Sequence, residues 1–312
     1  MQKKIFSTST TVIDNISLGD QYFKLKVKVS KKCFLQASPG QFAHVLCSQE
    51  IVSRKNRVFN DYYELKNYVR PNIDKLLESQ LLLRRPFCIH DAYVEEINGK
   101  SVCVFEFLIR TKRKGTAMLS KLSAGDHLDI LAPIGQPFDY KKSVKCDKNV
   151  IVVAGGMGVA PVVFLCRKLI ENDKYPEIFF GFEEDFSLNA GHTMKTDLNR
   201  ISKGLTITSN NLHEKWCKKG FVTDELEKHL KKMGADELLN TVIYSCGPHL
   251  MLKRLKQIAE QYGVDCEISM EERMACGIGA CAVCVCKSSE GLGYKKVCVD
   301  GPVFNSKEIT FE

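Results

Sequence analysis

Residues 150–161 read Val150-Ile151-Val152-Val153-Ala154-Gly155-Gly156-Met157-Gly158-Val159-Ala160-Pro161, and their pattern indicates the architecture of the middle of the chain. Its apolar first half predicts a buried strand, its glycines predict a tight turn, and its proline suits the first turn of a helix. A glycine turn after the first strand of a parallel sheet is where the pyrophosphate of a dinucleotide sits. We therefore predict that Gly155, Gly156 and Gly158 bind a nicotinamide dinucleotide. Because the pattern departs from GxGxxG, a plain strand–helix turn is the alternative interpretation.

The alternation of strands and helices continues to residue 269. Such a rhythm is typical of a parallel sheet with crossover helices, and we predict a five-stranded parallel nucleotide-binding sheet. Besides 150–154, apolar strands are expected at 178–182, 205–208, 242–246 and 265–269, with helices at 160–171, 222–232 and 248–262.

The segment Tyr244-Ser245-Cys246-Gly247-Pro248 ends the fourth predicted strand. The carboxyl ends of parallel strands face the ligand crevice. Cys246 and Gly247 are therefore predicted to line the nicotinamide pocket. The alternative for Cys246 is a buried core thiol.

The residues before 145 follow a shorter period. Apolar and polar residues alternate in 23–29, and Asn98-Gly99 separates two further alternating stretches. Period two predicts half-buried strands, and Asn-Gly is a strong hairpin signal. Short strands at this spacing predict an antiparallel β-barrel. Residues 48–80 interrupt the pattern with apolar residues at roughly helical spacing, which we interpret as a partly helical insertion.

Two short motifs in this half suit a flavin dinucleotide. In Arg85-Pro86-Phe87-Cys88 the guanidinium can meet a diphosphate as a fork, and the small side chain of Cys88 can reach the reactive edge of the flavin. Gly115-Thr116 opens a predicted helix, where free amide groups make an anion site. Together the two motifs predict FAD, although Arg-Pro also occurs in ordinary strands and turns.

Five of the 14 cysteines lie near the end of the chain, at Cys276, Cys281, Cys284, Cys286 and Cys298. The spacing C-x4-C-x2-C with a distant fourth cysteine is that of plant-type ferredoxins, and loop glycines let the backbone approach inorganic sulfide. We predict a 2Fe–2S cluster held by Cys276, Cys281, Cys284 and Cys298. Cys286 is the alternative fourth ligand. Structural zinc is the alternative metal, although zinc usually prefers two CxxC-like pairs.

Charge and hydropathy exclude several functional classes. The 312 residues carry a net charge of +8, spread without a focused basic stripe, so we expect no nucleic-acid binding. The basic N-terminus lacks a following apolar region, and glycines and a proline break the longest apolar run, 150–165. Neither a signal peptide nor a membrane span is predicted. We expect a cytoplasmic protein without a disulfide framework.

In this order the motifs resemble the ferredoxin–NADP reductase superfamily over nearly the whole chain. The tail, with Glu271-Glu272-Arg273-Met274-Ala275-Cys276 and Cys298–Phe304, is similar to the electron-transfer subunits of NAD-dependent (class B) dihydroorotate dehydrogenases. The matching residues upstream are Pro39-Gly40-Gln41-Phe42, Arg85-Pro86-Phe87-Cys88, Gly115-Thr116, Gly155-Gly156-x-Gly158-x-x-Pro161 and Cys246-Gly247-Pro248.

The resemblance implies three parts. They are an FAD-binding barrel at 1–145 with the insertion 48–80, an NAD-binding domain at 146–269 and a 2Fe–2S tail at 270–312. Family members usually carry Ser or Thr where Cys88 stands, and a thiol is the weaker hydrogen-bond donor. By motif matching, the residues that contact FAD are Arg85, Pro86, Phe87, Cys88, Leu108, Ile109, Arg110, Gly115 and Thr116.

The three cofactors together indicate an electron relay. A nicotinamide exchanges electrons as a hydride, an iron–sulfur cluster takes one at a time, and FAD does both and must lie between them. No protein acid or base is needed, so we predict no catalytic side chain. The acidic loop Glu183-Glu184-Asp185 favours NAD over NADP, because carboxylates would repel a 2′-phosphate.

The resemblance also implies a partner. It would be the FMN-containing catalytic subunit of dihydroorotate dehydrogenase, in a heterotetramer with two of each chain, acting in pyrimidine biosynthesis. One alternative is a reductase subunit of a sulfide dehydrogenase, a hydrogenase or a ferredoxin-linked bifurcating complex. The non-enzyme alternative is a zinc-stapled nucleotide-binding interaction protein.

Overall fold

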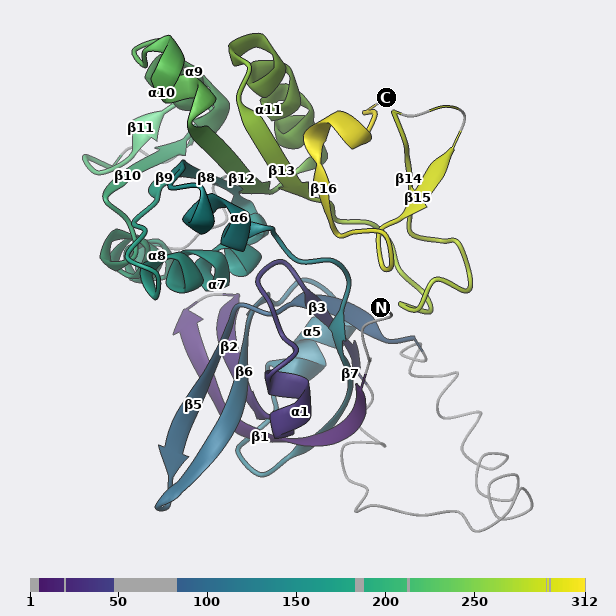
Figure 1. Ribbon diagram of the computed structural model, residues 1–312. Coiled ribbons are helices and arrows are strands. Elements are labelled where there is room, and N and C mark those ends of the chain that lie inside the picture. Colours follow the sequence, from purple (N-terminus) through teal and green to yellow (C-terminus); the bar gives the residue numbers. More distant parts are fainter. Residues whose placement is uncertain are drawn as a thin grey trace.

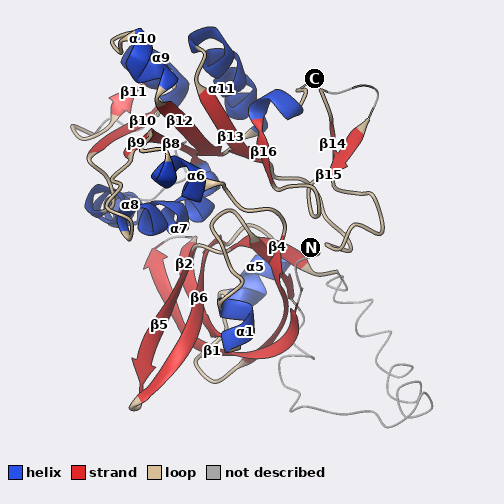
Figure 2. Cartoon of the chain, in the orientation of Figure 1, coloured by secondary structure: helices blue, strands red, loops and turns tan. Residues whose placement is uncertain are grey.

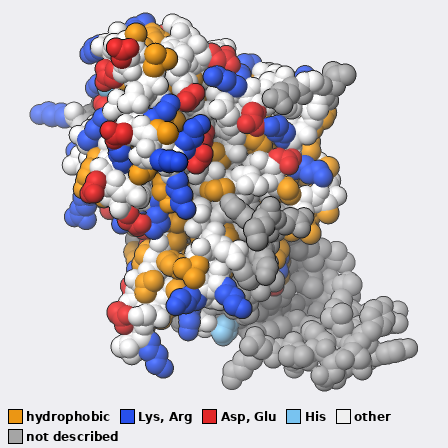
Figure 3. All heavy atoms as spheres, in the orientation of Figure 1, with side chains coloured by type: hydrophobic (Ala, Val, Ile, Leu, Met, Phe, Trp, Pro, Cys, Tyr) orange, Lys and Arg blue, Asp and Glu red, His pale blue; other side chains and the backbone are white. Residues whose placement is uncertain are grey.

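The computed structural model describes residues 6–19, 21–47, 83–182, 188–211, 214–289, 291 and 293–311. The predicted insertion at 48–80 and the acidic loop Glu183-Glu184-Asp185 lie outside these ranges. Among the helices described, none combines the length and the hydropathy that crossing a membrane requires. On the face shown in Figure 3, basic and acidic side chains are interspersed.

Seven strands of the N-terminal part form one antiparallel sheet in the order β4-β3-β7-β1-β2-β6-β5 (Figure 1). The two edge strands are linked by Ile89 and His90 alone, so the sheet curls back toward itself. β4 and β5 are not hydrogen-bonded to each other, and the closed barrel stays a prediction. The elements are β1 (Phe6–Gly19), β2 (Tyr22–Lys28), α1 (Lys31–Phe34), β3 (Phe42–Leu46), β4 (Arg85–Cys88), β5 (Asp91–Ile97), β6 (Lys100–Arg110), α5 (Lys114–Leu119) and β7 (His127–Ile134).

Hydrophobic alternation explains how this sheet is packed. Phe23, Leu25 and Val27 of β2 are at most 4% exposed and share one core with the aromatic residues of β6. The predicted hairpin is confirmed, because Asn98 and Gly99 join β5 to β6. Their φ angles of 51° and 72° are both positive, as a two-residue type I′ turn requires.

The second sheet has the order β11-β10-β9-β8-β12-β13-β16. Its first six strands are parallel and β16 is antiparallel. The predicted count of five strands was wrong, because β11 and β16 are too short to show a hydrophobic period and exist through pairing with a longer neighbour. The strands are β8 (Asn149–Gly155), β9 (Glu177–Phe182), β10 (Gly204–Ser209), β11 (Lys218–Lys219), β12 (Thr241–Cys246), β13 (Asp265–Ser269) and β16 (Val303–Asn305).

Helices cover both faces of the second sheet (Figure 2). α7 and α8 pack on one face, which is turned toward the curled sheet, and α9 and α11 pack on the other. The short helix η2 forms the glycine turn between β8 and α7. The helices are α6 (Tyr140–Lys145), η2 (Gly156–Gly158), α7 (Val159–Ile170), α8 (Leu188–Arg200), α9 (Val222–Leu230), α10 (Ala235–Leu239) and α11 (His249–Tyr262).

The cysteine-rich tail is tied to both sheets. It contains β14 (Val285–Lys287), β15 (Tyr294–Lys296), β16 and η3 (Ser306–Glu308). β16 extends the second sheet, with Phe304 opposite Ile268 of β13. The amide of Gln136, just after β7, donates to the carbonyl of Gly301 at 2.6 Å. The tail is therefore held where the two sheets meet.

Candidate functional site

A cavity of about 350 Å³ opens where the curled N-terminal sheet, the second sheet and the cysteine-rich tail meet. Met157 and Ala160 line it from the glycine turn and the start of α7, and Glu271 lines it from the tail. Arg85 and Gly115 are not among its lining residues. The predicted flavin residues that do line it are Pro86, Phe87, Cys88, Leu108, Ile109, Arg110 and Thr116.

The two arginines before Pro86 have different partners. Arg84 donates from Nη2 to Oδ2 of Asp129 at 2.8 Å and from Nη1 to the carbonyl of Asp129 at 2.9 Å. Arg85 donates from Nη1 to the carbonyls of Leu83, at 2.9 Å, and Arg84, at 3.4 Å. Of these two arginines, only Arg84 pairs with a carboxylate of the described residues. The Arg85 guanidinium is therefore the better candidate for binding an anionic ligand.

The hydroxyl of Thr116 is hydrogen-bonded within its own turn. It accepts from the amides of Lys112, at 2.9 Å, and Arg113, at 3.1 Å, and donates to the carbonyl of Arg113 at 3.0 Å. The first intrahelical bond of α5 runs from the amide of Ala117 to Arg113, so the amides of residues 114–116 have no partner within the helix. A diphosphate bound here would meet backbone amides, not the hydroxyl.

Cys88 of β4, Cys246 at the end of β12 and Glu271 of the tail lie near one another. Burial raises the pKa of Cys88 and of Cys246, and the Glu271 carboxylate raises both further. The thiol of Cys246 is also hydrogen-bonded to the side chain of Ser269. Both cysteines therefore stay neutral thiols at neutral pH. Cys246 is completely buried and is not a lining residue of the cavity, as expected of a core thiol.

Sequence reasoning did not single out Glu271 as a site residue. More than a third of its surface is open to solvent, yet the surrounding cavity wall desolvates its carboxyl and raises its pKa. One signal could have found it. Glu271 follows β13 by two residues, and the carboxyl ends of parallel strands face the ligand crevice.

The glycine turn packs tightly against the end of β12. A Cβ on Gly158 would lie 2.1 Å from the carbonyl oxygen of Cys246. A Cβ on Gly247 would lie 2.4 Å from Cε of Met251. Gly156 has open space around it. Glycine is favoured there because its φ of +52° is one that other residues rarely adopt. The two predicted nicotinamide motifs are thus brought together, although of these turn residues only Met157 lines the cavity.

The four cysteines predicted to hold the cluster lie together in two pairs. The amide of Cys281 donates to Sγ of Cys276 at 3.4 Å, and the thiol of Cys284 lies close enough to that of Cys298 to add to the effect of burial in raising the pKa of Cys298. Sγ of Cys286 instead lies 3.6 Å from a carbonyl of the β14–β15 hairpin. In the described part of the chain, no three His, Cys, Asp or Glu side chains form a group that could hold a metal ion. Two pairs suit a two-iron cluster, and the ligand assignment stays a prediction.

The surroundings of Cys276 favour a thiolate. Burial raises its pKa, but hydrogen bonds from the amides of Ile278, Cys281 and Ala280 lower it more, and the pKa falls to about 6. Thiolates are the ligands of iron–sulfur clusters, and amide hydrogens directed at sulfur stabilise their charge. The donor set therefore fits the predicted group.

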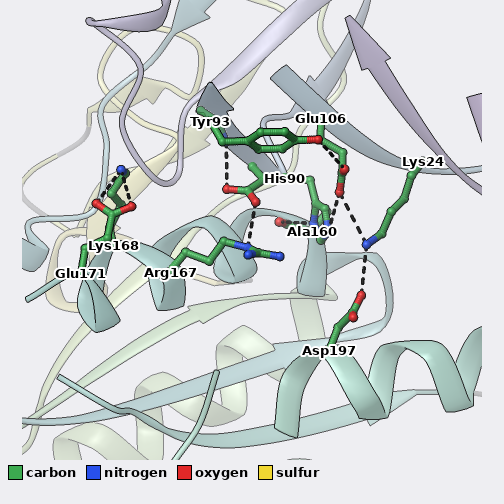
Figure 4. Close-up of polar contacts among 11 residues, drawn as sticks. Lys24, His90, Tyr93, Glu106, Ala160, Arg167, Lys168, Glu171 and Asp197 are labelled. Atoms are coloured by element: carbon green, nitrogen blue, oxygen red, sulfur yellow. Dashed lines mark hydrogen bonds and ion pairs between the residues drawn. The ribbon is translucent and has the colours of Figure 1, made fainter. Parts of the chain in front are cut away.

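A buried polar network joins the curled sheet to α7 and α8 (Figure 4). Nδ1 of His90 lies 2.9 Å from the carbonyl oxygen of Ala160, and its Nε2 lies 3.7 Å from Oε1 of Glu106. Nζ of Lys24 lies 3.5 Å from the same carboxylate and 3.0 Å from Asp197 of α8. His90 follows β4 by two residues, and Ala160 follows the glycine turn by two residues. The His90–Ala160 bond therefore links the predicted flavin strand to the predicted pyrophosphate turn.

We expect His90→Leu to slow flavin reduction by NADH roughly tenfold or more without loss of FAD, because a lost interdomain bond misaligns the two cofactors. His90→Asn keeps a donor at the Nδ1 position and should restore most of the rate. The matched control is Lys168→Met, which breaks an ion pair between α7 and its C-terminal cap residue Glu171. Rapid-mixing absorbance of the flavin measures the rate, and a wild-type rate in His90→Leu would contradict the prediction.

Comparison with known proteins adds an independent line of observation. The family model for the iron–sulfur cluster binding domain of dihydroorotate dehydrogenase B matches residues 271–310. The model for the oxidoreductase NAD-binding domain matches residues 152–257. These matches fall on the tail and on the second sheet.

Two curated relatives are similar over most of the chain. The electron transfer subunit of dihydroorotate dehydrogenase B (NAD(+)) from Caldanaerobacter subterraneus is 33% identical over 276 residues, covering 86% of this chain and 98% of that one. The subunit of the same name from Clostridium perfringens is 36% identical over 218 residues, covering 69% and 78%.

Two solved structures share the fold. The NADH-dependent reduced ferredoxin-NADP oxidoreductase matches with a TM-score of 0.69 at 20% identity, over 97% of this chain and 90% of that one. A ferredoxin NADP+ reductase from Neisseria gonorrhoeae, solved with FAD and NADP, matches with a TM-score of 0.55 at 12% identity, over 82% and 92%. The ferredoxin–NADP reductase-like fold with a C-terminal iron–sulfur domain is confirmed.

Proposed function

The chain belongs to the family of electron transfer subunits of dihydroorotate dehydrogenase B (NAD(+)), and on this premise we propose that it passes electrons between NAD and the catalytic subunit that oxidises dihydroorotate. The relay uses FAD and a 2Fe–2S cluster held by this chain. FAD, when bound, exchanges a hydride with the nicotinamide and single electrons with the cluster.

The single observation that carries the proposal is the convergence of three segments on one cavity. β4, the start of α7 and the first residues of the tail all contribute side chains to its wall. A protein that binds a single cofactor would not require three segments to meet at one cavity. A relay does, because the flavin must lie within reach of both the nicotinamide and the cluster.

The chain's own residues bind and orient the groups. Arg85 supplies a guanidinium that no carboxylate of the described residues holds, and the amides of residues 114–116 supply donors for a diphosphate. The neutral thiols of Cys88 and Cys246 introduce no charge beside the site of hydride transfer. Cys276, Cys281, Cys284 and Cys298 hold the cluster, with Gly155, Gly156 and Gly158 at the pyrophosphate.

Several finer features belong to the same proposal. The catalytic partner contains FMN and assembles with this chain as a heterotetramer with two copies of each. The complex acts in the cytoplasm, in pyrimidine biosynthesis. The chain divides into an FAD-binding barrel at 1–145, an NAD-binding domain at 146–269 and a cluster-binding tail at 270–312.

The proposal is tested first by the cofactor content of the intact chain. Protein purified aerobically should absorb as a flavin together with an oxidised iron–sulfur cluster, and NADH should bleach the flavin band. Iron, sulfide and flavin are measured on the same sample. A colourless preparation that contains zinc and neither iron nor flavin would overturn the proposal.

Exposed apolar residues of the cluster loop are the proposed contact with the catalytic subunit. Ile278, Val283 and Val299 are 54%, 49% and 43% exposed, and Cys281 beside them is exposed. Ile278→Glu should weaken the complex at least tenfold while NADH-dependent dye reduction stays normal, because a buried carboxylate at a contact is costly. Leu239→Glu on α10, at a residue 70% exposed, is the matched control. If both variants weakened the complex equally, the cluster loop would not be the contact with the catalytic subunit.

A further inference from the structure

His44 of β3 is a buried side chain whose polar atoms lack partners. It is 0% exposed, and neither Nδ1 nor Nε2 has a hydrogen-bond partner among the described residues. Buried polar groups in proteins are almost always hydrogen-bonded, and leaving one unpaired costs roughly 1–3 kcal/mol. The ring therefore needs a hydrogen-bond partner that the described residues of the chain do not supply.

The position of His44 indicates what that partner is. On one side, β3 pairs with the predicted flavin strand, with His44 opposite Pro86. On the other side, a Cβ built on Gly277 would lie 2.6 Å from Nδ1 and 3.1 Å from Cε1 of the same ring. Gly277 is the neighbour of Cys276 in the cluster loop. The imidazole thus lies between the flavin strand and the cluster loop, with Nδ1 toward the loop.

The charge state of the ring suits a hydrogen-bond donor. Burial, together with the positive charges of Arg84 and Arg85, lowers the pKa of His44 to about 4. At neutral pH the imidazole is neutral, with one N–H donor and one acceptor nitrogen. The lone pairs of thiolate and sulfide sulfur are acceptors for such a donor, and hydrogen bonds to sulfur are known to set cluster potentials.

We infer that the ring N–H of His44 donates a hydrogen bond to the sulfur shell of the 2Fe–2S cluster, either the Cys276 thiolate or an inorganic sulfide, and so makes the cluster easier to reduce. The inference rests on the proposed function, because it needs the cluster to be present. A donor beside sulfur stabilises the more negative, reduced cluster over the oxidised one. His44 is a positioning and tuning residue, and it does not itself ligate iron.

The test is a redox titration of the purified holoprotein, with the reduced cluster followed by electron paramagnetic resonance and the flavin by absorbance. His44→Phe keeps a planar ring and removes both nitrogens. We expect His44→Phe to change the equilibrium distribution of one electron between FAD and the cluster about tenfold in favour of FAD. For one electron this corresponds to about 59 mV. His44→Asn keeps a donor at the Nδ1 position and should titrate close to the wild type. His127→Phe, on the neighbouring strand β7, is the control and should not shift the partition.

A second measurement needs no variant of the site. In wild-type protein grown with isotope-labelled histidine, pulsed resonance of the reduced cluster should show coupling to one histidine nitrogen. A fully loaded His44→Phe protein with the wild-type partition would overturn the inference. If that variant fails to take up the cluster, absence of the nitrogen coupling in the wild type overturns it instead. Failure of the proposed function has a different signature, since the wild-type protein would then contain no iron at all.

Discussion

Cys298→Ser is expected to abolish the iron–sulfur cluster, whereas Cys286→Ser is expected to leave it intact. Cys298 lies beside Cys284 and near Cys276, and burial and both of these cysteines raise the pKa of its thiol. The Cys286 sulfur lies 3.6 Å from the carbonyl of Lys295 in the β14–β15 hairpin. Loss of one of four thiolates removes half of the protein ligands of one iron. Iron and acid-labile sulfide content, measured with the visible spectrum, gives the result.

The two variants control for each other, because both replace a buried tail cysteine by serine. Flavin content should stay at the wild-type value in both, since neither residue lines the cavity between the sheets. The reverse pattern, with iron lost only in Cys286→Ser, would reassign the fourth ligand. Loss of iron in both variants together with loss of thermal stability would point to a packing defect of the tail.

Gly158→Ala is expected to destabilise the fold by about 3 kcal/mol and to abolish NADH binding. The added Cβ would lie 2.1 Å from the carbonyl oxygen of Cys246 and 2.6 Å from the amide nitrogen of Gly247. Both neighbours are backbone atoms, so no side-chain rotation relieves the clash. The turn between β8 and α7 must move away from β12, and with it the predicted pyrophosphate site.

Thermal unfolding and NADH titration of the flavin spectrum measure both effects of Gly158→Ala. Gly234→Ala is the control, because nothing lies within 4 Å of a Cβ there. It should change stability by less than about 1 kcal/mol and leave NADH binding unchanged. A Gly158→Ala protein that binds NADH like the wild type would show that the turn does not depend on this close approach.

Local patterns in the sequence were enough to predict the long elements. The alternation in 23–29 and the Asn98-Gly99 turn each carry their own periodic or conformational signal, and the structure has both as expected. β11 and β16 carry no such signal. They consist of two and three residues and are strands only because β10 and β13 offer free edges to them.

The site was predictable as a set of segments but not as a set of contacts. Arg84 and Arg85 are adjacent in the sequence, and only the fold shows that Asp129 holds the first of them. Thr116 was predicted for its anion-binding position, and the fold shows its hydroxyl bound within the turn. Glu271 could have been inferred from its place just after β13, whereas His44 became a candidate only because the cluster loop meets β3 beside it, which no spacing rule in one sequence can reveal.

Electron relay through this chain is tested by dihydroorotate-dependent reduction of NAD in the reconstituted complex. The catalytic subunit alone should oxidise dihydroorotate with an artificial acceptor and should not reduce NAD. Addition of this chain should confer NAD reduction, and addition of Cys298→Ser should not. Equal NAD reduction with the wild type and with a cluster-free Cys298→Ser chain, or NAD reduction by the catalytic subunit alone, would contradict a relay through this chain.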